Sequence, residues 1–122
     1  MDDAQSWYIS GLSFQAQDRH QEALLAFEQS LALDPGNAGA WNGKGMALAH
    51  LLENAEAIQA FDRALALGED NTFVWYSRGT ALHLLSRDED AVQSFDRALE
   101  IDPDNPLAWT GRGRCPALSR KV

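Results

Sequence analysis

The chain has 122 residues, of which 45% are hydrophobic and 23% charged, an ordinary balance for one globular domain with a modest core. Its formal net charge of −8 disfavours non-specific binding to nucleic acid or to an anionic membrane surface. A single cysteine excludes an intrachain disulfide, and no apolar run approaches the ~18 residues that a membrane-spanning helix needs.

Four tryptophans stand 34 residues apart, and a glycine follows each of them by four residues. The four pairs are Trp7 and Gly11, Trp41 and Gly45, Trp75 and Gly79, and Trp109 and Gly113. A fixed period in this range is typical of stacked supersecondary repeats. With tryptophan counted as position four, the chain divides into three full repeats, 4–37, 38–71 and 72–105, and a partial fourth.

Each full repeat carries two helical stripes. In the first repeat, Trp7, Gly11 and Phe14 have the i, i+4, i+7 spacing of one helix face, and Ala23 and Phe27 begin a second stripe. The small residues at Gly11 and Ala23 would let the two helices approach closely, with the aromatic rings filling the space around the crossing. We expect helices over residues 4–17, 20–33, 38–51, 54–67, 72–85, 88–101 and 106–114.

The second helices need stop signals, and each repeat has one. Pro35 and Pro103 end the helices of the first and third repeats, because proline cannot continue a helix and restricts the residue before it. In the second repeat, Gly68 can adopt the left-handed C-cap conformation instead. Pro116 predicts that the last helix is short, a cap over 106–114, followed by a basic tail over 116–122.

This pattern of Trp, Gly, Ala and Phe resembles the tetratricopeptide repeat (TPR) family over residues 1–115. The resemblance implies one all-α domain, an α-solenoid of antiparallel helix pairs stacked into a right-handed superhelix, with the first helices lining a concave groove. The consensus leucine at position seven is replaced by Ser10, Lys44, Arg78 and Arg112. A row of basic residues there could attract an anion, or the stems could pack between helices with the heads turned to nearby acids.

By this resemblance, the groove of this chain is apolar and aromatic, with a few neutral polar groups. The candidate peptide-binding residues are Tyr8, Leu12, Asn42, Met46, Phe73, Tyr76 and His83. Methionine and aromatic side chains suit adaptable binding surfaces, and the Asn42 amide could hold a peptide backbone. The alternative is that these side chains only cover neighbouring helices.

The groove differs from the carboxylate clamp with which some family members grip acidic C-termini. The clamp positions hold Tyr8, Leu12, Gly43, Phe73 and Ser77, none of which can pair with a carboxylate as Lys or Arg would. We therefore expect a protein-interaction module that binds a protein or peptide partner without a clamp. The alternative is a self-assembly element that forms a homo-oligomer through a poorly capped C-terminal edge.

Other chemistry finds little support in the sequence. We expect no enzyme, no cofactor and no metal site, because no phosphate loop or HExxH motif occurs and His50 and His83 supply only two ligands for a groove metal. His20 is expected to be solvated and Cys115 to be an exposed, incidental cysteine. Because the chain starts without a basic and apolar leader, the expected location is cytoplasmic.

Overall fold

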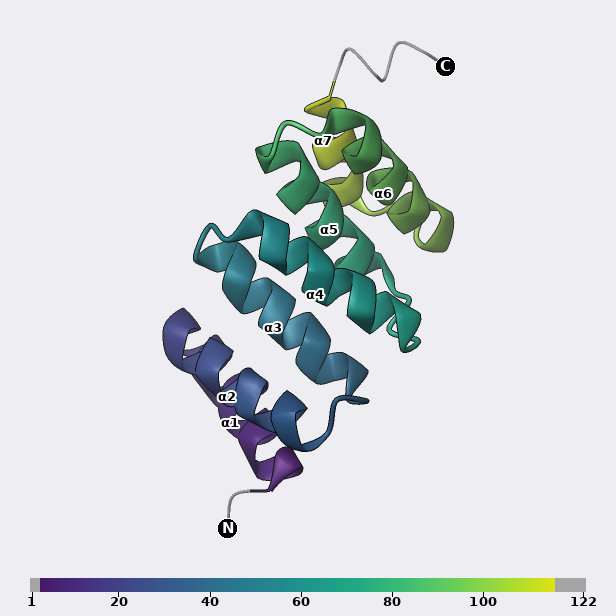
Figure 1. Ribbon diagram of the computed structural model, residues 1–122. Helices are drawn as coiled ribbons and strands as arrows, with labels where there is room; N and C mark the ends of the chain where they lie inside the picture. The colour runs from purple at the N-terminus through teal and green to yellow at the C-terminus, as the bar shows by residue number, and fades with distance from the viewer. Residues whose placement is uncertain (1–2, 116–122) are drawn as a thin grey trace. The chain divides into compact units, whose positions relative to one another are not determined.

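The computed structural model describes residues 3–115, which form seven α-helices and no β-strand (Figure 1). The helices are α1 (Ala4–Ala16), α2 (His20–Leu33), α3 (Ala38–His50), α4 (Asn54–Ala66), α5 (Thr72–Leu84), α6 (Asp88–Ile101) and α7 (Pro106–Gly113). Every helix begins at the predicted residue, and five of the seven end one residue earlier than predicted, where the last predicted residue is the C-cap. The prediction for Pro116 and the basic tail lies outside the described residues.

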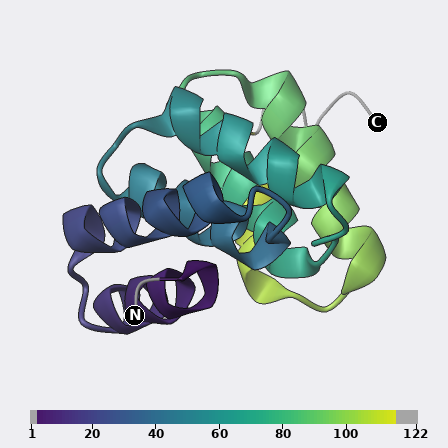
Figure 2. The same cartoon turned by 60° about the horizontal axis from the view of Figure 1, so that its bottom comes forward.

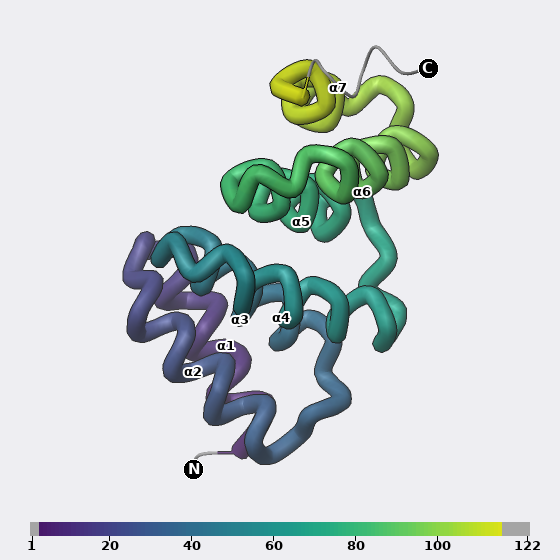
Figure 3. The backbone as a smooth tube through the Cα atoms, turned by 45° about the horizontal axis from the view of Figure 1, so that its top comes forward, coloured from purple at the N-terminus to yellow at the C-terminus, as the bar shows by residue number. Residues whose placement is uncertain are grey.

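The helices fall into two compact units. The N-terminal unit, Met1–Glu69, contains two helix pairs, α1 with α2 and α3 with α4, and α2 also packs on α3. In Figure 2 the antiparallel pairing of α1 (purple) and α2 (blue) is visible at the N-terminal end. The C-terminal unit, Asp70–Val122, contains the α5–α6 pair, and α7 packs on both of its helices (Figure 3).

An acceptor side chain caps the N-terminus of each first helix and of α7. In every case a side-chain oxygen accepts a hydrogen bond from the backbone N–H three residues later, at 2.8–3.0 Å, which satisfies one of the donors that a helix start leaves open. The four caps are Asp3, Asn37, Asn71 and Asn105. They stand 34 residues apart like the tryptophans, so the helix starts follow the same period.

Tight left-handed turns join the two helices of each pair. Asp18, Leu52 and Ser86, the fifteenth residues of the three repeats, have φ of 59°, 65° and 62°. Around Leu52, the N–H of Glu53 donates to Leu48 at 2.8 Å and the N–H of Leu52 donates to Ala49 at 3.0 Å, the Schellman pattern of a helix end. Gly68 ends α4 in the same way with φ 103°, which confirms its predicted left-handed C-cap.

Fully buried phenylalanines from the second helices form the centre of the packing. In the N-terminal unit, Phe27 lies between Gly11 of its own repeat and Gly43 of the next, where an added Cβ would come within 2.6 Å and 2.4 Å of its ring. In the C-terminal unit, Phe95 is held in the same way between Gly79 and Gly111. The predicted close approach at position eight is thus confirmed for Gly11, Gly45 and Gly79, and the glycines at position six add a second contact that was not predicted.

Gly113 does not follow this rule. An added Cβ there would meet no atom within 4 Å, so the expected packing reason for this glycine is wrong. The physical cause is that the part of the chain described by the structure contains no further helix after α7 whose side chains could press on it.

Candidate peptide-binding face

The predicted groove residues of the N-terminal unit come from α1 and α3. Tyr8 is half-buried, its ring 6.1 Å from that of Phe27, and its hydroxyl reaches the start of α3, where a Cβ on Gly39 would lie only 2.5 Å from it. Leu12, one turn further along α1, is 40% exposed. Tyr8 therefore lies across the α1–α3 boundary, and Leu12 offers an accessible apolar side chain beside it.

Asn42 and Met46 stand one turn apart on α3, and both are half-buried. The Oδ1 atom of Asn42 is buried and accepts no hydrogen bond from the residues that the structure describes. A buried acceptor without a donor costs free energy, so this amide has an unused capacity for a backbone N–H. Gly43, which the resemblance also placed in the groove, is instead buried against Phe27.

The C-terminal unit repeats part of this arrangement on α5. Tyr76 occupies the position of Tyr8 and packs on Phe95 with the ring centroids 6.0 Å apart. Phe73 is 49% exposed near the start of the helix. We call the set Tyr8, Leu12, Asn42 and Met46 the first-helix face of the N-terminal unit, and Phe73 and Tyr76 form a separate set in the C-terminal unit.

His83 differs from the other predicted groove residues because its ring is engaged. Its Nδ1 atom lies 2.9 Å from Asp88 Oδ1 and 3.6 Å from Cys115 Sγ. Cys115 is only 1% exposed, so its expected place on the surface is wrong. It is buried because it follows α7 directly, and α7 packs on α5 and α6. Burial and the neighbouring Asp88 carboxylate raise the pKa of the Cys115 thiol above its ordinary value.

The other histidines are also arranged differently from the prediction. His20 and His50 stack on each other within the N-terminal unit, with ring centroids 4.1 Å apart and an interplanar angle of 7°. His20 is half-buried rather than solvated, since it opens α2 beside the last turn of α3. The sequence could not indicate the stack, because these two residues are 30 positions apart and have no shared repeat position.

The basic residues at position seven turn to acids and aromatic rings. Lys44 lies 3.7 Å from Glu28, and the Arg112 guanidinium donates to Asp96 at 2.6 Å. Arg78 donates to the buried Ser94 hydroxyl at 2.6 Å. Lys44 and Arg78 also lie over the rings of the tryptophans three residues before them. These contacts favour the interpretation in which the charged groups at position seven turn to nearby partners. The first-helix face is left without a charged residue.

Comparisons with known proteins show which family has this repeat pattern. Family models described as tetratricopeptide repeat match residues 8–72 and 73–105. Among curated proteins, none matches the sequence significantly. None of the described helices has both the length and the apolar character needed to cross a membrane.

Solved structures share the fold over nearly the whole chain. The Arabidopsis OM64 TPR domain is 22% identical with a TM-score of 0.89, covering 93% of this chain and 94% of its own. The first TPR of Spaghetti (RPAP3), bound to the HSP90 peptide SRMEEVD, is 24% identical with a TM-score of 0.89, covering 97% and 94%.

YrrB, titled a TPR protein with an unusual peptide-binding site, is 26% identical with a TM-score of 0.85, covering 93% of this chain and 58% of its own. These likenesses and the seven described helices confirm the predicted all-α helical-repeat solenoid fold. With family models matching most of its length, the chain belongs to the tetratricopeptide repeat family, whose members are protein-interaction modules.

Proposed function

We propose that this protein binds a peptide segment of a partner protein on the first-helix face of its N-terminal unit. One observation carries the proposal: the accessible side chains of this face are apolar or neutral. Helices α1, α3 and α5 contain only two side chains charged at neutral pH, Lys44 and Arg78, and both are turned to other partners. An exposed leucine beside a half-buried tyrosine and a half-buried methionine is the composition of a binding surface rather than of a solvated face.

The same face argues for a ligand that does not end in an acidic motif. The Spaghetti domain is bound to a peptide that carries two glutamates and a terminal aspartate. In this chain, two of the clamp positions are buried, Gly43 and Ser77, and three are uncharged side chains, Tyr8, Leu12 and Phe73. Because nothing at these positions supplies a cation and the chain carries a net charge of −8, an acidic peptide would gain no charge pairing here.

The ligand that fits is a neutral or basic segment with apolar anchors. Such anchors would pack on Leu12 and Met46, and the Asn42 amide, turned about its last torsion angle, would accept a backbone N–H of the bound segment. Basic flanking residues would speed association through the field of the acidic chain.

A display screen of random peptides against the full chain tests this, followed by fluorescence anisotropy on the selected peptides. We expect Leu12→Ser and Met46→Ala each to weaken binding at least tenfold, a loss of about 1.4 kcal/mol. Leu33→Ser is the matched control, because Leu33 is an exposed leucine on a second helix. Circular dichroism verifies that every variant keeps its helices.

Two results would overturn the proposal. One is a set of peptides whose affinity responds equally to Leu33→Ser and to Leu12→Ser. The other is that the acidic peptide SRMEEVD binds more tightly than any selected neutral peptide, which would mean that cations outside the face direct recognition.

A second candidate function, self-assembly, is favoured by the surface of α7. Leu107 and Trp109 are 54% and 53% exposed on this short helix. Trp41 and Trp75 are each flanked by an arginine of their own second helix, Arg63 and Arg97, at 5.3 Å and 5.4 Å from the ring. No described helix follows α7 to cover Trp109 in this way.

Sedimentation velocity separates the two functions. Self-assembly predicts a concentration-dependent oligomer that Leu107→Glu abolishes and Leu12→Ser does not. A chain that stays monomeric at high micromolar concentration rules self-assembly out and leaves peptide binding as the function of the free protein.

A further inference from the structure

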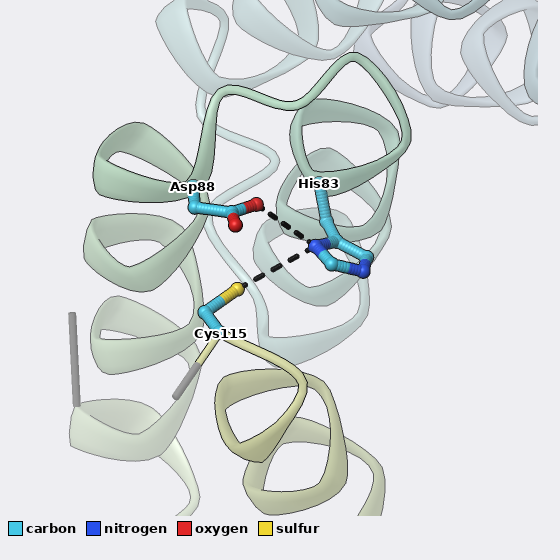
Figure 4. A group of neighbouring side chains, drawn as sticks. All are labelled: His83, Asp88 and Cys115. Carbon is cyan, nitrogen blue, oxygen red and sulfur yellow. Dashed lines mark hydrogen bonds and ion pairs between the residues drawn. The ribbon is translucent and has the colours of Figure 1, made fainter. Parts of the chain in front are cut away.

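Three different ligand-type side chains converge in the C-terminal unit, where the ends of its described helices meet. His83 stands in the last turn of α5, Asp88 opens α6, and Cys115 follows α7 (Figure 4). One donor atom of each, Nδ1, a carboxylate oxygen and Sγ, lies within 4.8 Å of the other two. In the described part of the chain, this is the one group of three or more such residues that are so close.

The turns at the ends of the helices position these three side chains. The turn at Ser86, with φ 62°, reverses the chain between His83 and Asp88 within five residues. At the other end, the N–H of Cys115 donates to the Arg112 carbonyl at 3.0 Å as α7 closes. Since α7 packs on both α5 and α6, the Cys115 side chain is brought against the other two.

The contacts do not form a Cys–His–Asp relay. In such a relay the thiol and the carboxylate bond to the two different nitrogens of the imidazole ring. Here both Asp88 and Cys115 approach the same nitrogen, Nδ1 (Figure 4). The Cys115 thiol also lies 3.9 Å from the Gly111 carbonyl, so these contacts hold the three side chains together without aligning a relay through the ring.

The spacing fits a small divalent ion. With zinc bond lengths of roughly 2.0–2.3 Å, a tetrahedral centre separates imidazole nitrogen from sulfur by roughly 3.6 Å and from a carboxylate oxygen by roughly 3.3 Å. The observed distances are 3.6 Å for Nδ1 to Sγ and 2.9 Å for Nδ1 to Oδ1. Opening the His83–Asp88 contact by a few tenths of an ångström would bring that pair to the zinc value, and all three donor atoms lie within 4.8 Å of one another.

We propose that His83, Asp88 and Cys115 form a zinc site, with the fourth position open to water or to a donor from a bound partner. The mixed nitrogen, sulfur and oxygen set suits Zn²⁺, whereas Mg²⁺ and Ca²⁺ take oxygen ligands. The sulfur binds as thiolate, so loading the site releases a proton from the Cys115 thiol to solvent. This site is independent of the proposed peptide-binding function, and it assigns His83 to the metal rather than to the peptide.

Cobalt titration tests the site directly. The full chain, free of any polyhistidine tag, reduced and stripped with a chelator, is titrated with Co²⁺ and then with Zn²⁺. We expect one equivalent of Co²⁺ to produce a sulfur-to-cobalt charge-transfer band and the intense visible bands of a tetrahedral ion, both lost when Zn²⁺ displaces it. Zn²⁺ should also raise the Tm of the native chain.

Variants separate this site from incidental binding. Cys115→Ser should remove the charge-transfer band, and His83→Gln and Asp88→Asn should each weaken Co²⁺ binding at least tenfold. The control is His50→Gln, because His50 lies outside the cluster in the other unit. Retained helix content by circular dichroism keeps a folding defect apart from a lost ligand.

The proposal is wrong if the native chain, with its thiol shown to be reduced, gives no sulfur-to-cobalt band and no Zn²⁺-dependent Tm shift. It is also wrong if Cys115→Ser and His83→Gln bind Co²⁺ as the native chain does, since the ion would then sit elsewhere.

Discussion

At the scale of single residues, the left-handed turns between paired helices impose backbone strain because their central residues are not glycine. A left-handed backbone costs a residue with a Cβ about 1–2 kcal/mol, and glycine avoids this cost. Asp is better tolerated in this conformation than a large aliphatic residue, so Asp18 suits its turn and Leu52 does not. Leu52 is 76% exposed, so its side chain contributes little packing in return.

We therefore expect Leu52→Gly to stabilise the protein by about 0.5–1 kcal/mol, the relief of strain less the extra flexibility of glycine in the unfolded chain. The free energy of unfolding from urea titration measures the change. Leu85→Gly is the control, because Leu85 is a helix C-cap with φ −91°, where glycine relieves no left-handed strain. A loss of stability at both positions would mean that the turn does not strain Leu52.

At the scale of helices, a buried phenylalanine between two glycines sets how closely neighbours pack. Alanine in place of Gly43 would gain about 1 kcal/mol in helix propensity. Its Cβ, however, would lie 2.4 Å from the Phe27 Cζ, and Phe27 is fully buried with no room to move. Overpacking of this kind costs about 1–3 kcal/mol, so the steric term should exceed the propensity gain.

Gly43→Ala should accordingly lower the Tm and the free energy of unfolding, despite being a better helix former. Gly113→Ala provides the contrast, since it adds the same atom in α7 where nothing lies within 4 Å. We expect that variant to be neutral or slightly stabilising in the same urea titration. Equal behaviour of the two alanine variants would show that backbone freedom, and not the contact with Phe27, explains the glycines.

Helix starts carry one pH-sensitive cap. Asp3 caps α1, and the hydrogen bond from the Ser6 N–H lowers the pKa of its carboxyl below the ordinary 3.8. A group with a lowered folded-state pKa stabilises the fold above its unfolded pKa and loses that contribution as pH falls through the folded value. The start of α1 should therefore loosen below about pH 4.

NMR measures this through the Ser6 amide, whose chemical shift and hydrogen exchange should change with the titration of Asp3. The Ala40 amide, which donates to Asn37 at 3.0 Å, is an internal control because its acceptor does not ionise. Asp3→Asn should keep the cap and remove the pH response. A Ser6 amide that titrates identically in that variant would contradict the assignment.

The helices could be predicted because the residues that mark their packed faces and their ends recur with the 34-residue period. Trp, Gly and Phe mark the packed faces, while proline or Gly68 marks the stops. The packing role of the glycines at position six was harder to predict. Gly43 and Gly111 occupy this position in the second and fourth repeats, whereas the first and third repeats have other residues there. Their role depends on which neighbour presses on them, which a single helix pattern does not contain.

The candidate sites show a similar division. The apolar character of the first-helix face follows from residue type, so Leu12 and Met46 could be proposed as binding residues from the sequence. The cluster around His83 could not, because Cys115 lies 32 residues away and reaches it only through the packing of α7. A cysteine directly after a short last helix has no periodic partner that would have signalled burial.

At the scale of the whole molecule, acidic side chains predominate in one part of the sequence and basic side chains in another. Residues 1–105 carry 18 acidic and 6 basic side chains, a net of −12, and residues 106–122 carry four basic and no acidic side chains. Several ion pairs are exposed and lie within one helix turn, such as Arg87 with Asp90, and such pairs are worth at most about 1 kcal/mol each. Repulsion among the excess acidic side chains should therefore oppose folding at low ionic strength.

Salt should consequently raise the Tm, because screening weakens repulsion between acids that are more than about 10 Å apart. Gln93 is an exposed position on α6 at which to vary the charge in both directions. Gln93→Lys changes the net charge from −8 to −7 and Gln93→Glu changes it to −9. In low salt the lysine variant should melt above the native chain and the glutamate variant below it, by a few tenths of a kcal/mol or about 1 kcal/mol at most.

Thermal denaturation across a series of NaCl concentrations distinguishes this from a local helix effect. Lysine and glutamate have similar helix propensities, so a difference that shrinks as salt rises reflects charge and not backbone preference. A native Tm that falls with salt would mean that attractive pairs such as Arg112 with Asp96 outweigh the excess of acids. The acidic surface would then be a feature for partner choice, with little influence on the stability of the fold.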